Sequence, residues 1–174
     1  MGAKQISRAR AGRCAAAADD ERRTILDAIR HIVRVLRVSS RAAERRVGLS
    51  AAQLFALHKL ADGRALSLNE LAERTFTHQS SVSVVVARLQ GRGLVTRRRS
   101  SADGRRIELA LTGAGRALLR RAPAAAQERL IAALDQLGAA ERRRLSQTLG
   151  RLVRTMGMAG EPPMLFEEPE RRRE

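Results

Sequence analysis

The sequence has no tryptophan or tyrosine, and phenylalanine occurs only 3 times in 174 residues. Modules that bind single-stranded RNA stack bases on aromatic rings, so this mode of recognition is not expected. A single cysteine, Cys14, cannot form an internal disulfide, which suits the reducing cytoplasm. No apolar run approaches the roughly 18 residues of a membrane-spanning helix. The alanines at 15–18 are too few for the apolar core of a secretory signal. We therefore expect a cytoplasmic protein.

Acidic residues are also scarce relative to basic ones. The chain has 34 Lys and Arg against 18 Asp and Glu, a net charge of +16 at pH 7. Such an excess favours a polyanionic partner, because each phosphate that a basic side chain neutralises releases counterions. A membrane surface is the competing polyanion, but no basic helix carries the Trp or Phe anchors expected of a membrane-bound one. The charge therefore points to nucleic acid and against a membrane.

Residues 67–89 predict two short helices in series. Ser67 and Glu70 have the spacing of a capping box. Thr77 is expected to cap the second helix, where Val82, Val85 or Val86, and Leu89 fall at helical spacing. The opposite side of that helix carries short or small residues, which would let it lie deep in a major groove. Taken alone, this pattern also fits an ordinary amphipathic helix with a solvated face.

A basic hairpin is expected next. Gly91 and Gly93 end the helix, residues 94–97 read as a strand, and residues 100–104 as a tight polar turn. Ile107, Leu109 and Leu111 then alternate with polar or small residues as a returning strand. The predicted fold class is mainly α: a winged helix-turn-helix with a two-stranded wing and flanking dimerisation helices.

Three segments resemble the MarR family of bacterial transcriptional regulators: residues 80–97, the D-G-R at 103–105, and the L-T-G-A-G at 111–115. The resemblance implies that Arg105 enters the minor groove and that Asp103 holds it there. Val84 stands where family members often carry a longer polar or basic side chain. The residues expected at the DNA are Gln79, Ser80, Ser81, Ser83, Val84, Arg88, Arg97, Arg98, Arg99, Asp103 and Arg105.

Helices are expected on both sides of the winged helix. A wide apolar band covers residues 25–36, and Ser50 with Gln53 forms a second capping box. After the wing, Thr112 caps a helix that Pro123 interrupts near residue 120. Gly138 precedes a last helix with apolar residues at 4-3-4 spacing, among them Leu145, Leu149, Leu152, Val153 and Met156.

These elements predict one domain with two tails. Residues 1–18 are expected to form a disordered basic arm, residues 19–159 the MarR-like winged-helix domain, and residues 160–174 a disordered tail. Within the domain, the DNA-binding part is expected at 50–112 and the dimerisation helices at 20–47 and 113–158.

The resemblance implies a homodimeric regulator, most often a repressor, on a pseudo-palindromic double-stranded operator in the nucleoid. It also implies a small-molecule effector in a cleft between the dimerisation and DNA-binding parts. The residues assigned to this cleft are His31, Val35, Leu54, His58 and Leu118.

Covalent chemistry and cofactors have little support. The three histidines lie in different elements without a metal-binding spacing, so no metal, cofactor or enzymatic activity is expected. A contribution of His31 and His58 to a metal site stays open as an alternative. So does a redox switch at Cys14, although the tyrosines that hold the reactive cysteine of peroxide-sensing family members are missing. A non-specific nucleoid-type DNA-binding protein is a further alternative.

Overall fold

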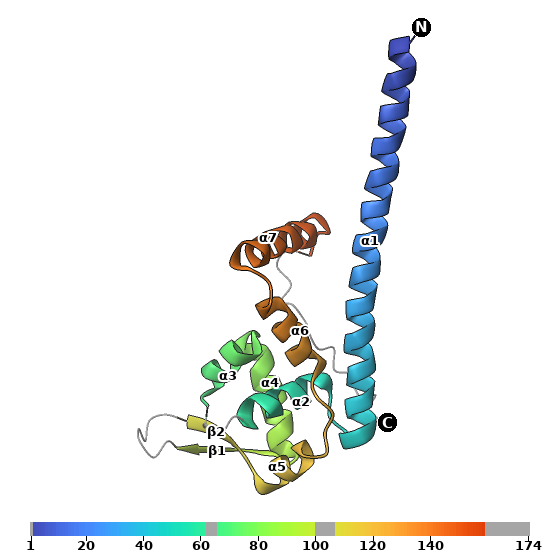
Figure 1. Ribbon diagram of the computed structural model, residues 1–174. Helices are drawn as coiled ribbons and strands as arrows, with labels where there is room; N and C mark the ends of the chain where they lie inside the picture. Colours follow the sequence, from blue (N-terminus) through green and yellow to red (C-terminus); the bar gives the residue numbers. More distant parts are fainter. Residues whose placement is uncertain (1, 62–65, 100–106, 159–174) are drawn as a thin grey trace. The chain divides into compact units, whose positions relative to one another are not determined.

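The computed structural model describes residues 2–61, 66–99 and 107–158, with side chains from residue 17 onward. In these residues the chain forms mainly helices and one two-stranded antiparallel sheet (Figure 1). It divides into two compact units, residues 1–38 and 39–174. The elements are α1 (Gly2–Val47), α2 (Ala51–Ala61), α3 (Leu68–Thr75), α4 (Gln79–Gly91), β1 (Val95–Arg99), β2 (Ile107–Leu111), α5 (Gly113–Leu119), α6 (Ala126–Asp135) and α7 (Ala139–Thr155).

The first helix begins earlier than the sequence predicted. α1 is helical from Gly2, whereas residues 1–18 were expected to lack regular structure and the helix to begin near Asp20. The cause is composition, since residues 2–18 consist largely of alanine, arginine and other good helix formers and contain no proline. Cys14 lies within this helix, and its side chain is outside the described part.

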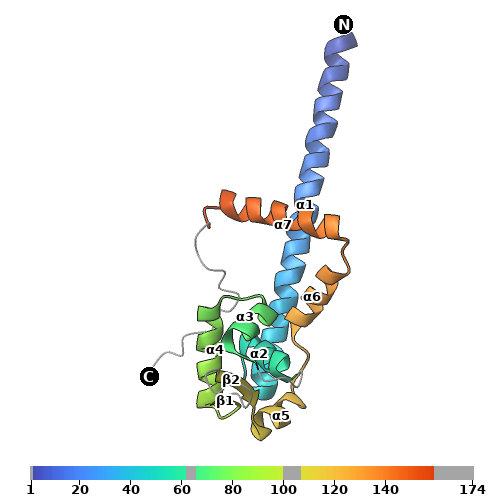
Figure 2. The same ribbon diagram turned by 90° about the vertical axis from the view of Figure 1, so that its left-hand side faces the viewer.

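The core of the second unit lies among α2, α3, α4 and the sheet, which gather together in both views (Figure 1 and Figure 2). Phe55, Leu57, Leu71, Leu89 and Leu109 are each at most 2% exposed. The expected capping box at the start of α2 is present: the Ser50 N–H donates to Gln53 Oε1 (3.2 Å), and the Gln53 N–H donates to Ser50 Oγ (3.3 Å).

The helix-turn-helix begins as expected but its turn differs. The Ser67 N–H donates to Glu70 Oε2 (2.7 Å) and the Glu70 N–H to Ser67 Oγ (3.3 Å), which confirms the capping box. The prediction that Thr77 caps the next helix is wrong, because His78 is the N-cap of α4 and its side chain makes no capping bond. The Thr77 hydroxyl donates instead to the Thr75 carbonyl (2.9 Å).

The wing is a regular antiparallel pair. β1 and β2 are in register from Val95 opposite Leu111 to Arg99 opposite Ile107, so β1 extends two residues beyond its predicted end at Arg97. Leu66 adds a bridge to Leu109, with N–H···O distances of 3.2 and 2.7 Å. A single bridging residue has no alternation pattern, and the sequence did not predict it.

The helices after the wing follow the predicted breaks. Thr112 Oγ1 accepts the Gly115 N–H (3.0 Å) and caps α5, which ends before Pro123. Gly138 separates α6 from α7. Gly115 packs closely on the start of the wing, because a Cβ atom at this position would lie 2.2 Å from the Leu94 carbonyl oxygen.

Candidate nucleic-acid interface

One side of α4 is buried and the other is open to solvent. Val82, Val86 and Leu89 are at most 4% exposed and fix the helix to the core, as their spacing predicted. On the other side, Gln79, Ser80, Val84 and Arg88 are exposed, and Ser81 and Ser83 are half-buried. Four of the six residues predicted for this helix therefore lie on its accessible side, where the short side chains of Ser80 and Val84 permit close approach of the backbone.

Only the first residue of the first wing strand, β1, is buried in the core. Val95 is buried, whereas Thr96 and the three arginines that follow it are exposed. Arg98 lies directly opposite Glu108 on β2. Arg97 and Arg99 lie opposite Leu109 and Ile107 and have no acidic cross-strand partner. Because alternate strand residues face opposite sides, these two arginines share a face that Arg98 does not.

Arg105, which the resemblance places in the minor groove, and Asp103, which it assigns to holding that arginine, lie outside the described residues. Their role therefore stays a prediction. In the sequence they lie between Arg99 and Ile107, the last paired residues of the hairpin.

The five residues assigned to a ligand cleft divide between the two units. His31 and Val35 belong to the first unit and are exposed. In the second unit, Leu54 is 1% exposed within the core cluster, and Leu118 packs partly buried against it. The ligand cleft as a set stays a prediction.

His58 is held in a polar contact between α2 and α6 that the sequence did not predict. Its Nε2 lies 3.4 Å from the Pro123 carbonyl oxygen and its Nδ1 lies 3.9 Å from Glu128 Oε2. Lys59 Nζ lies 3.4 Å from the other Glu128 oxygen and 5.3 Å from the centre of the Phe55 ring. Glu128 therefore joins the start of α6 to two consecutive residues of α2.

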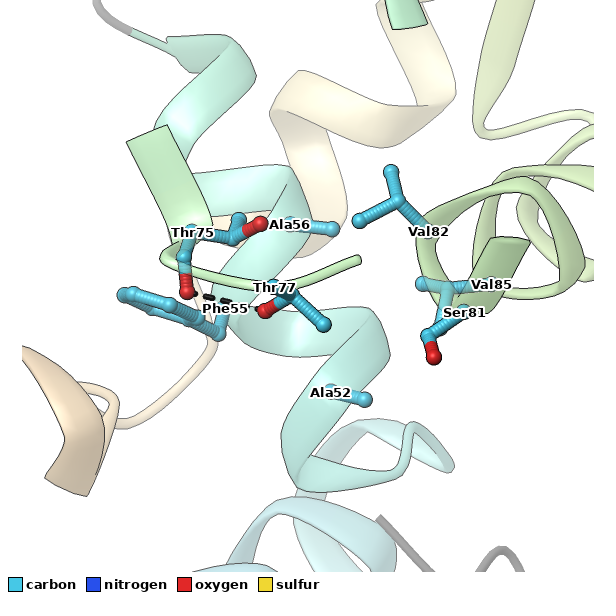
Figure 3. Close-up of a pocket in the computed structure, with 8 residues that line it drawn as sticks. All are labelled: Ala52, Phe55, Ala56, Thr75, Thr77, Ser81, Val82 and Val85. Carbon is cyan, nitrogen blue, oxygen red and sulfur yellow. Dashed lines mark hydrogen bonds between the residues drawn. The ribbon is translucent and has the colours of Figure 1, made fainter. Parts of the chain in front are cut away.

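A shallow apolar pocket, open to solvent, lies between α2 and α4 (Figure 3). The residues that line it are Ala52, Phe55, Ala56, Thr75, Thr77, Ser81, Val82 and Val85. Among the predicted site residues only Ser81 lines this pocket. It adjoins the turn that precedes α4, so an occupant would touch both the turn and the first residues of the helix.

The described residues contain no group of three or more His, Cys, Asp or Glu side chains placed to hold a metal ion. None of the described helices is both long enough and apolar enough to cross a membrane.

A helix with an exposed face of short side chains, set behind a tight turn and followed by a basic antiparallel hairpin, defines the winged helix-turn-helix class of DNA-binding proteins. The comparisons with known proteins agree with this class. Residues 47–106 match the model of the MarR family. The chain is 34% identical over 119 residues to the HTH-type transcriptional repressor Rv2887 of Mycobacterium tuberculosis, covering 67% of this chain and 86% of that protein.

Two further similarities support the family. Over 68 residues the chain is 37% identical to the HTH-type transcriptional repressor MdtR of Bacillus subtilis, covering 39% of this chain and 44% of that one. The crystal structure of the transcriptional regulator BldR from Sulfolobus solfataricus superposes with a TM-score of 0.51 at 25% identity, covering 78% of this chain and 96% of that one. The chain belongs to the MarR family and is a DNA-binding transcription regulator, not an enzyme.

Proposed function

We propose that the protein is a homodimeric repressor of the nucleoid that binds a pseudo-palindromic operator and leaves it when a small ligand binds. The observation that carries the proposal is the combination of an accessible α4 face with apolar stripes left exposed on α1 and α7. The α4 face would read DNA. The exposed apolar stripes would pack against a second copy of the chain.

The exposed apolar side chains are too many for a monomer surface. On α1, Ile25, Leu26 and Ile32 are 55%, 50% and 45% exposed. On α7, Leu149 and Met156 are 46% and 63% exposed, and no residue of α7 is buried in the single chain. Contiguous apolar surface of this kind is typical of protein interfaces. The stripes support pairing of the terminal helices between two copies.

A two-fold dimer would present two copies of α4 to successive major grooves about one helical turn apart, with the wings in the flanking minor grooves. Repression is proposed because the relatives from Mycobacterium tuberculosis and Bacillus subtilis are both named transcriptional repressors. Release would follow from the binding of a small ligand that changes the spacing of the two α4 helices. The family resemblance supports this step.

A non-specific nucleoid-type binder is the second candidate, because the net charge is +16 and the α4 face consists of short side chains. The two functions differ in how far an operator outcompetes random duplex DNA. Protection of one short sequence in genomic DNA at physiological salt supports the regulator. Uniform coating of any duplex supports the nucleoid protein.

Removing the wing arginine is expected to reduce operator binding without affecting the fold. Arg105→Ala should weaken binding roughly 10-fold, because an arginine in a narrow minor groove interacts with enhanced negative potential. Asp103→Ala should cause a smaller loss, since its implied role is to hold the arginine. Fluorescence anisotropy with labelled operator measures the affinity, and circular dichroism the thermal stability.

Arg129→Ala on α6 is the matched control, because it removes an equal charge from an exposed position outside the wing. Equal loss of affinity in both variants would show that only total charge matters. Unfolding of Arg105→Ala would assign the arginine a structural role instead.

Base-pair substitutions across a mapped operator should show how specificity is divided. Val84 offers only methyl groups and the serines are short, so direct readout in the major groove should be modest. Replacing an A·T pair beneath a wing by G·C is expected to cost about 1–3 kcal/mol, comparable with a major-groove mismatch. A binding titration over single substitutions measures both. If wing-facing positions are neutral, the wing is only an electrostatic clamp.

A further inference from the structure

Phe76, in the turn between α3 and α4, combines two unfavourable properties. Its φ angle is 52°, and among the described residues it is the one non-glycine residue with positive φ. Its side chain is 78% exposed, more than any other large apolar side chain in the described part of the chain. Backbone strain and an exposed aromatic ring thus occur at the same residue, immediately before the helix that faces DNA.

The strain follows from the way α3 ends. The Phe76 N–H donates to the Glu73 carbonyl (3.1 Å) and the Thr77 N–H to the Ala72 carbonyl (3.0 Å). This pair of hydrogen bonds is the Schellman motif, whose left-handed residue is usually glycine because a Cβ atom is disfavoured there. Glycine at residue 76 would satisfy the same hydrogen bonds without that cost, so the turn itself does not require a phenylalanine.

Contacts within the protein also contribute little to stabilising the Phe76 ring. Thr75 and Thr77, its two neighbours, line the apolar pocket, whereas Phe76 is not among the residues that line it (Figure 3). The other phenylalanine with a described side chain, Phe55, is 2% exposed in the core. Strained residues that the fold does not require occur preferentially at functional sites.

The position of Phe76 indicates what the ring contacts. His78, Gln79 and Ser80 are exposed at the start of α4, so Phe76 continues their accessible surface by two residues. The first turn of a recognition helix meets base edges and the adjoining backbone of the major groove. Those surfaces offer apolar groups to a ring, namely the thymine methyl and the carbons of deoxyribose.

We infer that Phe76 is a DNA-contact residue that packs on a thymine methyl and its deoxyribose beside the first turn of α4, and so adds thymine preference to an otherwise short-chained helix. This inference rests on the proposed function, because it requires α4 to lie in the major groove of an operator.

Phe76→Gly removes both the backbone strain and the aromatic ring. Its folding stability and its operator affinity are therefore expected to respond differently if the ring contacts DNA. The variant should melt at the same temperature as the parent or roughly 2–4 °C higher. Its operator affinity should nevertheless fall roughly 10-fold, as expected for loss of a buried aromatic contact. Phe76→Asn, which tolerates the left-handed conformation, should lose affinity in the same way, whereas Phe76→Leu should retain part of it.

Operators in which thymine is replaced by deoxyuracil, one position at a time, identify the contact. The parent should lose affinity at one position in each half-site, and Phe76→Gly should be insensitive at that same position. If the parent prefers the operator over random duplex but Phe76→Gly binds it equally well, the inference is overturned and the proposed function stands. If the parent shows no operator preference, the proposed function fails and the inference with it.

Discussion

The variant Gly115→Ala is expected to lose about 1–3 kcal/mol of folding free energy, or to fail to fold, because the new Cβ has no room. That atom would lie 2.2 Å from the Leu94 carbonyl oxygen and 3.2 Å from its carbonyl carbon. The same oxygen accepts the Thr112 N–H (3.1 Å), so moving it would disturb the junction of the wing with α5. Urea unfolding followed by circular dichroism measures the loss.

Gly113 provides the control in the same helix. A Cβ atom there meets nothing within 4 Å. Gly113→Ala should therefore be neutral or stabilise by about 0.4–1 kcal/mol, through the smaller entropy of the unfolded chain. Equal destabilisation by the two substitutions would contradict the close approach to Leu94 as the cause, because Gly113 makes no such approach.

A charge placed in the apolar stripe of α7 is expected to abolish dimerisation. Leu149→Asp would bury an unpaired carboxylate between two helices, which is costly. Sedimentation at micromolar concentration should change from dimer to monomer, and operator affinity should fall roughly 100-fold or more, since the two half-sites would no longer be bound together.

Gln147→Asp is the matched control, because two residues along a helix correspond to more than half a turn and place the same charge on the far side of α7. It should leave the dimer intact and reduce DNA binding only slightly. A stable monomer in the parent, or equal dissociation by both variants, would contradict the proposed dimer.

The features that the sequence predicted well are those with local causes. Ser67 and Glu70 lie three residues apart and form their capping box as the spacing required. Thr112 caps α5, and the break around Pro123 follows from the missing backbone donor and the restricted φ of proline. The buried stripe of α4 follows equally from the helical spacing of Val82, Val86 and Leu89.

The starts of α4 and α1 were predicted wrongly, and both errors also have local causes. Thr77 has a good capping side chain, but the left-handed residue before it places its hydroxyl on the Thr75 carbonyl, and α4 begins later. α1 begins earlier than expected because its alanines and arginines favour helix even without an apolar stripe.

Contacts between distant parts of the sequence could not be predicted. Lys59 and Glu128 are polar residues of different helices, and no periodicity shows that they pair. The Leu66 bridge to the wing is similarly a product of tertiary packing. For the candidate site, the accessible face of α4 and the exposed arginines of β1 were predicted, because burial periodicity alone determines them. The choice of Phe76 required its backbone angle, which the sequence does not contain.

The absence of any buried residue in α7 has a consequence for the lifetime of the protein. A helix of 17 residues without tertiary support is marginally stable in water, so α7 would owe its folding to the partner. A dissociated chain would then present an unravelled segment from which a protease can begin degradation. Chains that have not dimerised would be degraded selectively. The cellular abundance of the protein would then depend on dimer assembly as well as on expression.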